Sequence, residues 1–155
     1  TACRHINADG SEGVYAGEEL DLSYLHSVYS GSDKIITELR LRLQPGDPEA
    51  IRAKMDDLMN RRKSKQPLEY PSAGSVFKRP AGHFAGTLIE QCGLKGYRIG
   101  GAEVSEKHAG FIVNRGDATC SDVRRLIEHI QKEVFLQTSI ELQTEIKVVG
   151  ITQNG

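Results

Sequence analysis

The chain has 155 residues, of which 38% are hydrophobic and 26% are charged, and its formal net charge is -1. This length suits one ordinary domain, or one domain plus part of another, with a real hydrophobic core. The near-zero charge argues against a nucleic-acid partner, and the lack of a long apolar run argues against a membrane span. Three cysteines without C-x-x-C spacing indicate neither a disulfide framework nor a zinc site, so we expect a cytoplasmic protein that holds no metal.

The first third of the chain predicts strands. Residues 1–16 contain two short strand-like stretches around Asp9-Gly10, a dipeptide typical of a hairpin turn. Residues 34–43, KIITELRLRL, alternate at their end and predict a half-buried antiparallel strand. Its apolar face is expected to carry Leu39, Leu41 and Leu43. The sequence opens on Thr1 inside an expected strand, which suggests a piece of a longer protein.

A long helix is predicted after residue 47. Asp47 can cap its first turn, Pro48 suits its first helical position, and Pro67 ends it. Apolar residues at helical spacing predict one buried face, formed by Ile51, Met55, Leu58 and Met59. The helix finishes in the basic run RRKSK, residues 61–65, which suits the negative end of the helix dipole.

The second half mixes helices and strands. A short helix closed by Gly93 is predicted, with Phe84, Leu88 and Cys92 on one face. HAGFIVN at 108–114 predicts a buried strand, and TCSD at 119–122 fits the cap of a further helix. That helix is expected to bury Val123, Leu126, Ile127, Ile130 and Val134. Without a strict βαβ rhythm, we predict an α+β fold with a mixed or antiparallel sheet and packed helices.

The stretch YPSAGSVFKRPAG, residues 70–82, places Ser75 in a segment stiffened by proline and glycine. Gly74 allows a close backbone approach to a ligand, and the prolines at 71 and 80 reduce the conformational freedom of the loop. The pattern is not a G-x-S-x-G nucleophile elbow, because the second glycine is missing. Residue types alone leave two interpretations open: a hydroxyl displayed into a site, or a serine in a tight turn.

Further features carry the same ambiguity. The run at 61–65 suits a phosphate clamp or a solvated helix end, and GYRIGGAEV at 96–104 has the glycine density of an anion loop but not its spacing. His108, before an apolar strand, is either a ligand contact or a structural residue. Glu145 lies in the strand-like run ELQTEIKVVG, where alternation predicts exposure; an inward carboxylate would indicate a functional role.

Four motifs in order, PSAGSVFK, FAGTLIE, GYRIGGAEVS and KHAGFIVN, resemble the UDP-N-acetylenolpyruvoylglucosamine reductase family, in its shorter subtype. The resemblance implies a C-terminal substrate-binding domain attached to the tail of a flavin-binding domain. It assigns residues 1–65 to the remnant of the FAD-binding domain and residues 66–139 to the substrate-binding domain. A return strand at 140–150 would carry the catalytic glutamate, and residues 151–155 would form a tail.

The resemblance also implies site residues. Ser75 matches the serine that protonates the substrate, and Glu145 matches the glutamate that assists at the same carbon. Lys65 would lie near the substrate diphosphate and Arg62 near the junction of flavin and substrate. The implied substrate-binding residues are Tyr24, Arg62, Lys65 and His108. No metal is implied.

The implied reaction is the reduction of enolpyruvyl-UDP-N-acetylglucosamine to UDP-N-acetylmuramate, a precursor of peptidoglycan. In the family, NADPH reduces FAD, and the reduced flavin delivers hydride to C3 of the enolpyruvyl group. Charge then builds at C2, where Ser75 donates a proton. The resemblance implies a cytoplasmic, monomeric oxidoreductase whose partner is the nucleotide-sugar substrate, with no nucleic acid or membrane.

Two departures from the family pattern shape this expectation. The family's flavin-binding region lies mostly upstream of the first residue here, so we expect this chain not to retain FAD. In LSYLHSVYS, Leu25 stands where the family has the arginine that grips the substrate carboxylate. An inactivating change, a compensating cation such as Arg4 or Arg98, and a branch with altered function all remain open explanations.

Three function hypotheses follow. The chain is the catalytic half of a flavin-dependent reductase, or a non-catalytic fragment that binds the UDP-sugar alone. The third hypothesis, binding of nucleic acid or another polyanion through residues 61–65, conflicts with the near-neutral charge and the few aromatic residues.

Overall fold

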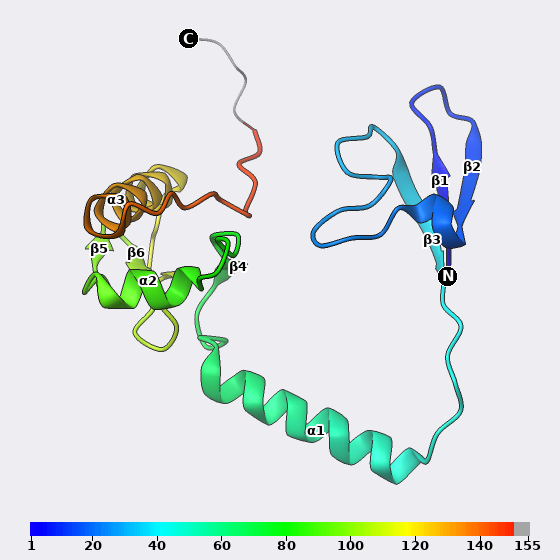
Figure 1. The fold of residues 1–155 in the computed structure, drawn as a ribbon, viewed down its shortest axis with the longest axis horizontal. Helices are drawn as coiled ribbons and strands as arrows, with labels where there is room; N and C mark the ends of the chain where they lie inside the picture. Colours follow the sequence, from blue (N-terminus) through cyan, green and yellow to red (C-terminus); the bar gives the residue numbers. More distant parts are fainter. Residues whose placement is uncertain (151–155) are drawn as a thin grey trace. The chain divides into compact units, whose positions relative to one another are not determined.

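The structure, a computed structural model, describes residues 1–150, and the predicted tail at 151–155 lies outside the described residues. Within residues 1–150 the predicted α+β class is confirmed: the strands form two antiparallel sheets and are accompanied by three α-helices (Figure 1). The chain divides into two compact units, Thr1–Ile51 and a second unit that begins at Arg52. No helix in the described part of the chain is long and apolar enough to cross a membrane.

The first unit is a three-stranded antiparallel sheet in the order β2-β1-β3. β1 spans Ala2–Ile6, β2 spans Glu12–Ala16 and β3 spans Ile35–Arg40. The predicted hairpin joins β1 to β2, and Gly10 at its turn has a φ of 83°, which glycine adopts without the steric cost of a side chain. A short 3-10 helix, η1 (Gly17–Leu20), follows β2 and buries Leu20.

The interior of this unit is an aromatic cluster around His5. The His5 ring is buried, stacks on Tyr15 with ring centroids 4.7 Å apart, and has its Nδ1 3.0 Å from the Tyr29 hydroxyl. The Tyr29 hydroxyl lies 3.3 Å from the carbonyl oxygen of Cys3 and donates to it. Burial raises the pKa of Tyr29, so the cluster keeps this hydroxyl protonated.

The third strand ends earlier than sequence alternation predicts. β3 stops at Arg40, so Leu41 and Leu43 lie beyond it. Leu39 is 57% exposed and Leu43 is 80% exposed, and the expectation of a half-buried strand through residue 43 is therefore wrong. Alternation separates the two faces of a strand, but burial needs a second layer of structure, and the described residues leave these leucines uncovered.

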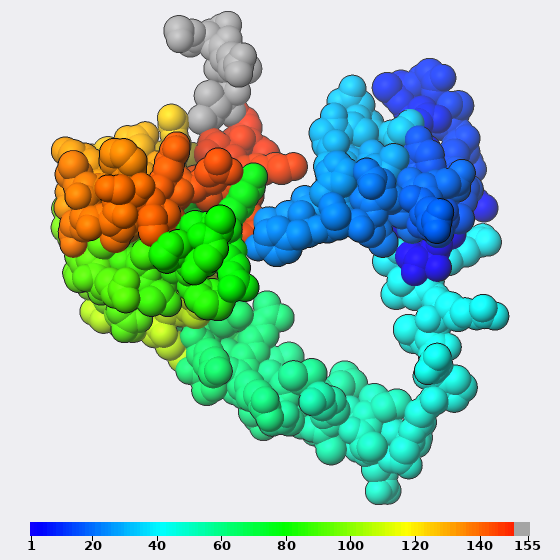
Figure 2. Space-filling model, in the orientation of Figure 1, coloured from blue at the N-terminus to red at the C-terminus, as the bar shows by residue number. Residues whose placement is uncertain are grey.

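α1 (Pro48–Lys65) forms where it was predicted, but it buries none of its residues. The side chain of Asp47 accepts a hydrogen bond of 2.7 Å from the amide of Ala50, as a cap should. The apolar residues of the expected buried face are exposed: Ile51, Met55, Leu58 and Met59. Figure 2 shows no other segment of the second unit over most of this helix. Helical spacing therefore predicted the helix correctly but not the burial of its apolar face.

The second unit is built on a four-stranded antiparallel sheet in the order β4-β7-β6-β5. The strands are β4 (Ser72–Ser75), β5 (Arg98–Ile99), β6 (Ala102–Val104) and β7 (Phe111–Asn114). α2 (Ala85–Gln91) packs against α3 (Cys120–Thr138), and α3 packs against β5 and β6. One core joins both helices and the central strands, with Leu88, Ile89, Val104, Ile112, Leu126 and Ile130 among its residues.

The start of α2 corrects one predicted core residue. Leu88 is buried and Cys92 packs against the core, as expected. Phe84 directly precedes the helix instead of lying in it, and its ring is exposed beneath the guanidinium of Arg79 at 4.0 Å. Because Phe84 has extended backbone angles, it leaves the helical periodicity that would have turned it toward the core.

α3 begins at the predicted cap and packs against the glycine-rich stretch. The Thr119 hydroxyl accepts from the amide of Asp122 at 3.1 Å, and the Asp122 carboxylate accepts from the amide of Thr119 at 3.0 Å. These bonds, together with Arg125, lower the pKa of Asp122 to about 2. Residues 94–104 form the β5–β6 hairpin, where a Cβ on Gly101 would lie 2.1 Å from the carbonyl oxygen of Gly116. The glycine is thus needed for close backbone packing, not for an anion loop.

Residues 140–150 do not form the predicted strand. The part after α3 makes one isolated antiparallel bridge, between Thr144 and Phe77. Leu142 anchors the segment because its side chain is fully enclosed in the core of the second unit. Ile140 and Ile146 pack partly against the same core. The segment is therefore held by these apolar contacts and a few hydrogen bonds instead of a ladder.

Candidate functional site

Ser75 is the last residue of β4 and lies opposite Phe111 of β7. The register of the two strands shifts between Ser72 and Ser75, and Gly74 within that irregular stretch has a φ of 86°. This angle is sterically costly for a residue with a side chain, which explains the glycine before the serine. The Ser75 hydroxyl is exposed and lies 3.3 Å from the carbonyl oxygen of Phe77, to which it donates. The structure thus presents the hydroxyl to solvent at a strand end.

Glu145 lies beside this strand end. Its backbone amide donates a 2.8 Å hydrogen bond to the carbonyl oxygen of Val76, the residue that follows Ser75. The amide of Lys78 donates to the carbonyl oxygen of Gln143, also at 2.8 Å. The side chain of Glu145 is exposed, as predicted, although the strand whose alternation led to that prediction does not form. Two residues far apart in the sequence are therefore placed on directly paired backbone segments.

His108 belongs to the same region through Gly110. Its Nδ1 accepts a 3.1 Å hydrogen bond from the amide of Gly110, whose carbonyl oxygen accepts from the amide of Val76 at 2.9 Å. The ring lies edge-on to Phe111, with centroids 4.9 Å apart, and Phe111 is the strand partner of Ser75. His108 is thus fixed by its own turn, before β7 and not within it, beside the strand pair that carries Ser75.

Sequence reasoning missed the two glycines that fix His108. A Cβ on Gly86 would lie 3.2 Å from Cε1 of His108, and a Cβ on Gly110 would lie 3.0 Å from the same atom. Both are tighter than ordinary contacts, so each glycine leaves room for the ring. For Gly110, the signal available in the sequence was its place two residues after His108 in the stretch HAG; Gly86 lies in a separate segment, where the sequence gives no such signal.

The basic end of α1 is exposed. Arg61 pairs with Asp57 one helical turn earlier, at 3.0 Å, and the Nε of Arg62 donates to the side chain of Gln66 at 3.0 Å. Lys65 ends the helix and has no ion pair or side-chain hydrogen bond within residues 1–150. The structure therefore leaves the Lys65 ammonium free to meet an anion, while the arginines already have neutral or acidic partners.

Tyr24 and Leu25 belong to the first unit. They form the tip of a tight turn closed by reciprocal backbone hydrogen bonds between Ser23 and His26, of 3.1 and 3.2 Å. Leu25 has a φ of 54°, in the left-handed region that is costly for a residue with a side chain, and its side chain is exposed. The turn thus exposes Leu25, which stands where the family pattern has an arginine, to solvent. It also holds this residue in a strained backbone conformation.

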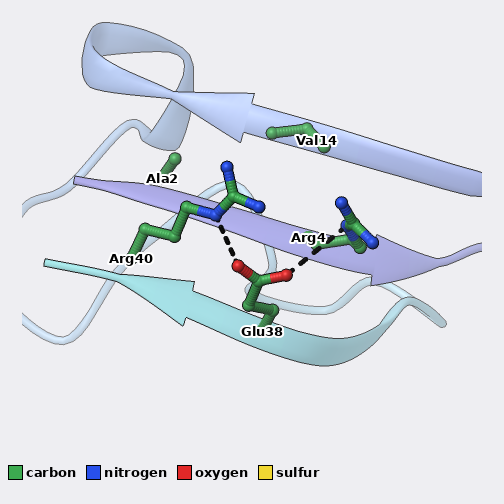
Figure 3. Close-up of a pocket in the computed structure, with 5 residues that line it drawn as sticks. All are labelled: Ala2, Arg4, Val14, Glu38 and Arg40. Atoms are coloured by element: carbon green, nitrogen blue, oxygen red, sulfur yellow. Dashed lines mark hydrogen bonds and ion pairs between the residues drawn. The ribbon is translucent and has the colours of Figure 1, made fainter.

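The two cations considered as replacements for that arginine are already paired. Figure 3 shows Glu38 of β3 between Arg4 and Arg40, and the Nε of Arg4 lies 3.6 Å from its carboxylate. Arg98 lies 3.0 Å from the largely buried carboxylate of Glu103. Each guanidinium is thus engaged with a carboxylate of its own unit, so neither is an unpaired cation in this structure.

Neither of two hollows within residues 1–150 has the size and charge expected of an FAD site. The hollow over the first sheet, lined by Ala2, Arg4, Val14, Glu38 and Arg40, measures about 50 Å³. Small-molecule sites usually measure about 300–1,000 Å³. A second pocket of about 390 Å³ adjoins β4, β7 and the start of α3. Its lining, which includes Val76 and Ile146, carries no charged side chain that could pair with a diphosphate.

Comparisons with known proteins agree with the motifs. The family model described as "UDP-N-acetylenolpyruvoylglucosamine reductase, C-terminal domain" matches residues 66–149. The chain is similar to the UDP-N-acetylenolpyruvoylglucosamine reductases of Clostridium perfringens (strain SM101 / Type A), at 53% identity, and Exiguobacterium sibiricum, at 56%. Each match covers 86% of this chain and 44% of the relative. The Staphylococcus haemolyticus reductase is 48% identical, over 94% of this chain and 47% of the relative.

The fold is also similar to that of solved structures. The crystal structure of UDP-N-acetylenolpyruvylglucosamine reductase from Thermus caldophilus has a TM-score of 0.79 and 37% identity, and the match covers 94% of this chain and 51% of that one. The chain thus spans about half the length of the curated relatives it matches. The order of motifs, the family model and this structural likeness together show that the chain belongs to the UDP-N-acetylenolpyruvoylglucosamine reductase family.

Proposed function

We propose that this chain supplies the substrate site and the proton donor for the NADPH- and FAD-dependent reduction of enolpyruvyl-UDP-N-acetylglucosamine to UDP-N-acetylmuramate. The proposal places the reaction in peptidoglycan precursor synthesis in the cytoplasm, catalysed by a monomer without nucleic-acid or membrane partners. The reducing half of the reaction requires the FAD and NADPH that the family implies, and we assign none of it to residues 1–150.

The observation that carries the proposal is the hydrogen bond between the amide of Glu145 and the carbonyl oxygen of Val76. It pairs the backbone beside Ser75 with the backbone of Glu145, so that a hydroxyl and a carboxylate occupy adjacent segments. Both side chains are exposed, and His108 adjoins the same strand pair. A proton donor and a second polar group are thus available on one edge of the second unit.

The chemistry assigned to Ser75 is proton donation to C2 of the enolpyruvyl group. The O–H bond of Ser75 breaks, a C–H bond forms at C2, and the exposed hydroxyl regains a proton from water. A serine is a weak acid, but a carbanion next to a carboxylate is a strong base, so the transfer is favourable if the hydroxyl is held at the correct face. Positioned acids contribute roughly 10²–10⁴-fold to rate, and the fixed turn at Gly74 supports such positioning.

The role of Lys65 in the proposal is contact with the substrate diphosphate. Its ammonium has no ion pair within residues 1–150, and a free lysine at a helix end is a ready partner for a phosphate charge. His108 and Arg62 complete the proposed substrate contacts within the second unit, and Tyr24 is the proposed contact from the first. Each of these assignments comes from the family pattern and can be tested by mutating the residue.

The decisive test measures NADPH oxidation and product formation in the full-length enzyme that contains this chain. Because Leu25 replaces the expected arginine, the background carries Leu25→Arg. Ser75→Ala is expected to lower the rate of product formation by about 10²–10⁴-fold. Ser121→Ala, at an exposed serine of α3 outside the proposed site, is the matched control and should keep the background rate. Normal product formation by folded Ser75→Ala would refute the assigned role.

A second candidate function is favoured by Leu25. A chain that lacks this cation suits a non-catalytic protein that binds only the UDP-sugar. Titration calorimetry of the 155-residue chain with UDP-N-acetylglucosamine tests this. Saturable heat that weakens in Lys65→Ala supports binding by this chain. No heat at millimolar ligand would end the idea.

A further inference from the structure

The segment that carries Glu145 leaves α3 at Thr138 and returns toward β4; residues 140–146 are called the return segment below. It has no strand ladder, only the single bridge between Thr144 and Phe77. The hydrogen bonds Glu145–Val76 and Lys78–Gln143 lie on either side of that bridge. Ile146, the residue after Glu145, packs partly against the core. The direction of the backbone between this contact and α3 therefore depends on the few hydrogen bonds of the segment.

The start of the return segment is fixed by Gln131, which the family motifs did not single out. This residue lies on α3, and its Nε2 donates a 2.8 Å hydrogen bond to the carbonyl oxygen of Leu142. The Gln131 side chain is half-buried, and the Leu142 side chain is 1% exposed. No other donor to this carbonyl is present within residues 1–150. A carbonyl beside a buried side chain needs such a partner, because water reaches it poorly.

The distance along the chain makes this bond relevant to Glu145. Three residues of extended chain span at most about 10–11 Å, so a fixed Leu142 leaves Glu145 little freedom. The Leu142 side chain is the fully buried anchor of the segment, and Ile140 and Ile146 pack against the same core on either side of it. Apolar contacts of this kind are not directional, so they set the depth of the segment but not the direction of its carbonyl groups. The Gln131 bond points the Leu142 carbonyl toward α3 and thereby orients the peptide that leads to Gln143 and the bridge.

We infer that Gln131 is a positioning residue for Glu145: through the carbonyl of Leu142 it holds the return segment in register with the strand end that carries Ser75. This inference rests on the proposed function for its catalytic consequence. Its structural content, the coupling of Gln131 to the hydrogen bonds of Glu145 and Lys78, stands on the geometry alone. Gln131 touches no proposed substrate contact and acts only through the return segment.

The first measurement is amide hydrogen exchange by NMR on the 155-residue chain. Gln131→Met keeps the length of the side chain and removes the donor. We expect exchange at the amides of Glu145 and Lys78 to rise about threefold to tenfold, the range that a net hydrogen-bond contribution predicts. The amides of Val104 and Ser105, which lie in and beside β6, should keep their rates. Gln137→Met, at an exposed position of the same helix, is the matched control and should change nothing.

A carboxylate at the same position gives a reversible version of the test. Gln131→Glu keeps the shape but has no donor while ionised, and regains an O–H donor when it is protonated. Exchange at Glu145, corrected for its intrinsic pH dependence, should therefore exceed wild type at pH 7 and approach it near pH 4, close to the ordinary pKa of a glutamate. A merely space-filling role for Gln131 would produce no such pH dependence.

The catalytic readout uses the full-length enzyme with Leu25→Arg. Gln131→Met is expected to lower kcat while KM and the rate of flavin reduction by NADPH stay unchanged. The inference is overturned if Glu145 and Lys78 exchange as in wild type, or if Val104 and Ser105 accelerate equally, which would indicate global destabilisation. Altered exchange together with a fully active Glu145→Gln would instead overturn the proposed role of Glu145 and leave the structural coupling in place.

Discussion

The backbone amide of Glu145 donates a 2.8 Å hydrogen bond to the carbonyl oxygen of Val76. Together with the bond from the amide of Lys78 to the carbonyl oxygen of Gln143, it joins the last described segment of the chain to the strand end that carries Ser75. It turns two motifs that are remote in the sequence into one edge of the second unit. The chemistry proposed for this edge depends on keeping the two segments together.

Restoring a cation at Leu25 should increase activity. In the full-length enzyme, Leu25→Arg is expected to raise the rate of product formation by roughly 10²–10³-fold, the size of effect seen when one charge-stabilising group is added or removed. Stability should not change, because both side chains are exposed and meet the same left-handed φ of 54°. Leu25→Lys is the control, because it adds a positive charge without the planar guanidinium group that can form two parallel hydrogen bonds with a carboxylate. Equal, low rates in all three proteins would remove the arginine from the mechanism.

The second unit should lose stability in acid as the carboxylate of Asp122 becomes protonated. Its pKa is about 2 in the fold, below the ordinary 3.8, mainly because the amide of Thr119 bonds its carboxylate. A carboxyl group whose pKa is lower in the fold than in the unfolded chain stabilises the fold at any pH above its unfolded pKa. This stabilisation is lost as the pH falls from about 4 toward 2. Urea unfolding across this range should show a steeper loss in wild type than in Asp122→Asn. Parallel curves would contradict the assignment, since the other carboxylates are the same in both proteins.

Even the smallest substitution at Gly101, to alanine, should destabilise the fold. A Cβ there would lie 2.1 Å from the carbonyl oxygen of Gly116 and 2.5 Å from the amide of Ala118, both backbone atoms that cannot move aside cheaply. Gly101→Ala is expected to lower the free energy of unfolding by about 1–3 kcal/mol or more. In Gly46→Ala the nearest atom is the end of the Ile51 side chain, 3.2 Å away, so little change is expected. Urea denaturation of both variants measures the difference.

Burial, not hydrophobicity, should decide the cost of truncating apolar residues. Ile130 is fully buried, and Ile130→Ala is expected to cost about 2–5 kcal/mol. Leu58 lies on the exposed side of α1, so Leu58→Ala should stay within about 0.5 kcal/mol in this chain. Denaturation midpoints compared at equal m-values test this. A large loss in Leu58→Ala would mean that α1 has a packing partner that residues 1–150 do not supply.

Patterns carried entirely by neighbouring residues were predicted correctly. The cap at Thr119 and Asp122 and the apolar spacing after it predict α3 because capping and helical periodicity act over a few residues. The Asp9-Gly10 turn predicts the first hairpin for the same reason. The strand at 34–43 and the apolar face of α1 were predicted in kind but not in burial, because local periodicity does not specify a second layer.

The sequence by itself determined the local elements, the α+β class and, through its ordered motifs, the family. Only the tertiary structure decided which residues meet: it pairs Glu145 with the backbone beside Ser75, holds His108 against Gly86 and Gly110, and leaves Arg4 and Arg98 engaged with carboxylates. The reason is physical. Propensities and caps depend on neighbours along the chain, whereas a site depends on contacts between distant segments whose placement follows from core packing and a few hydrogen bonds.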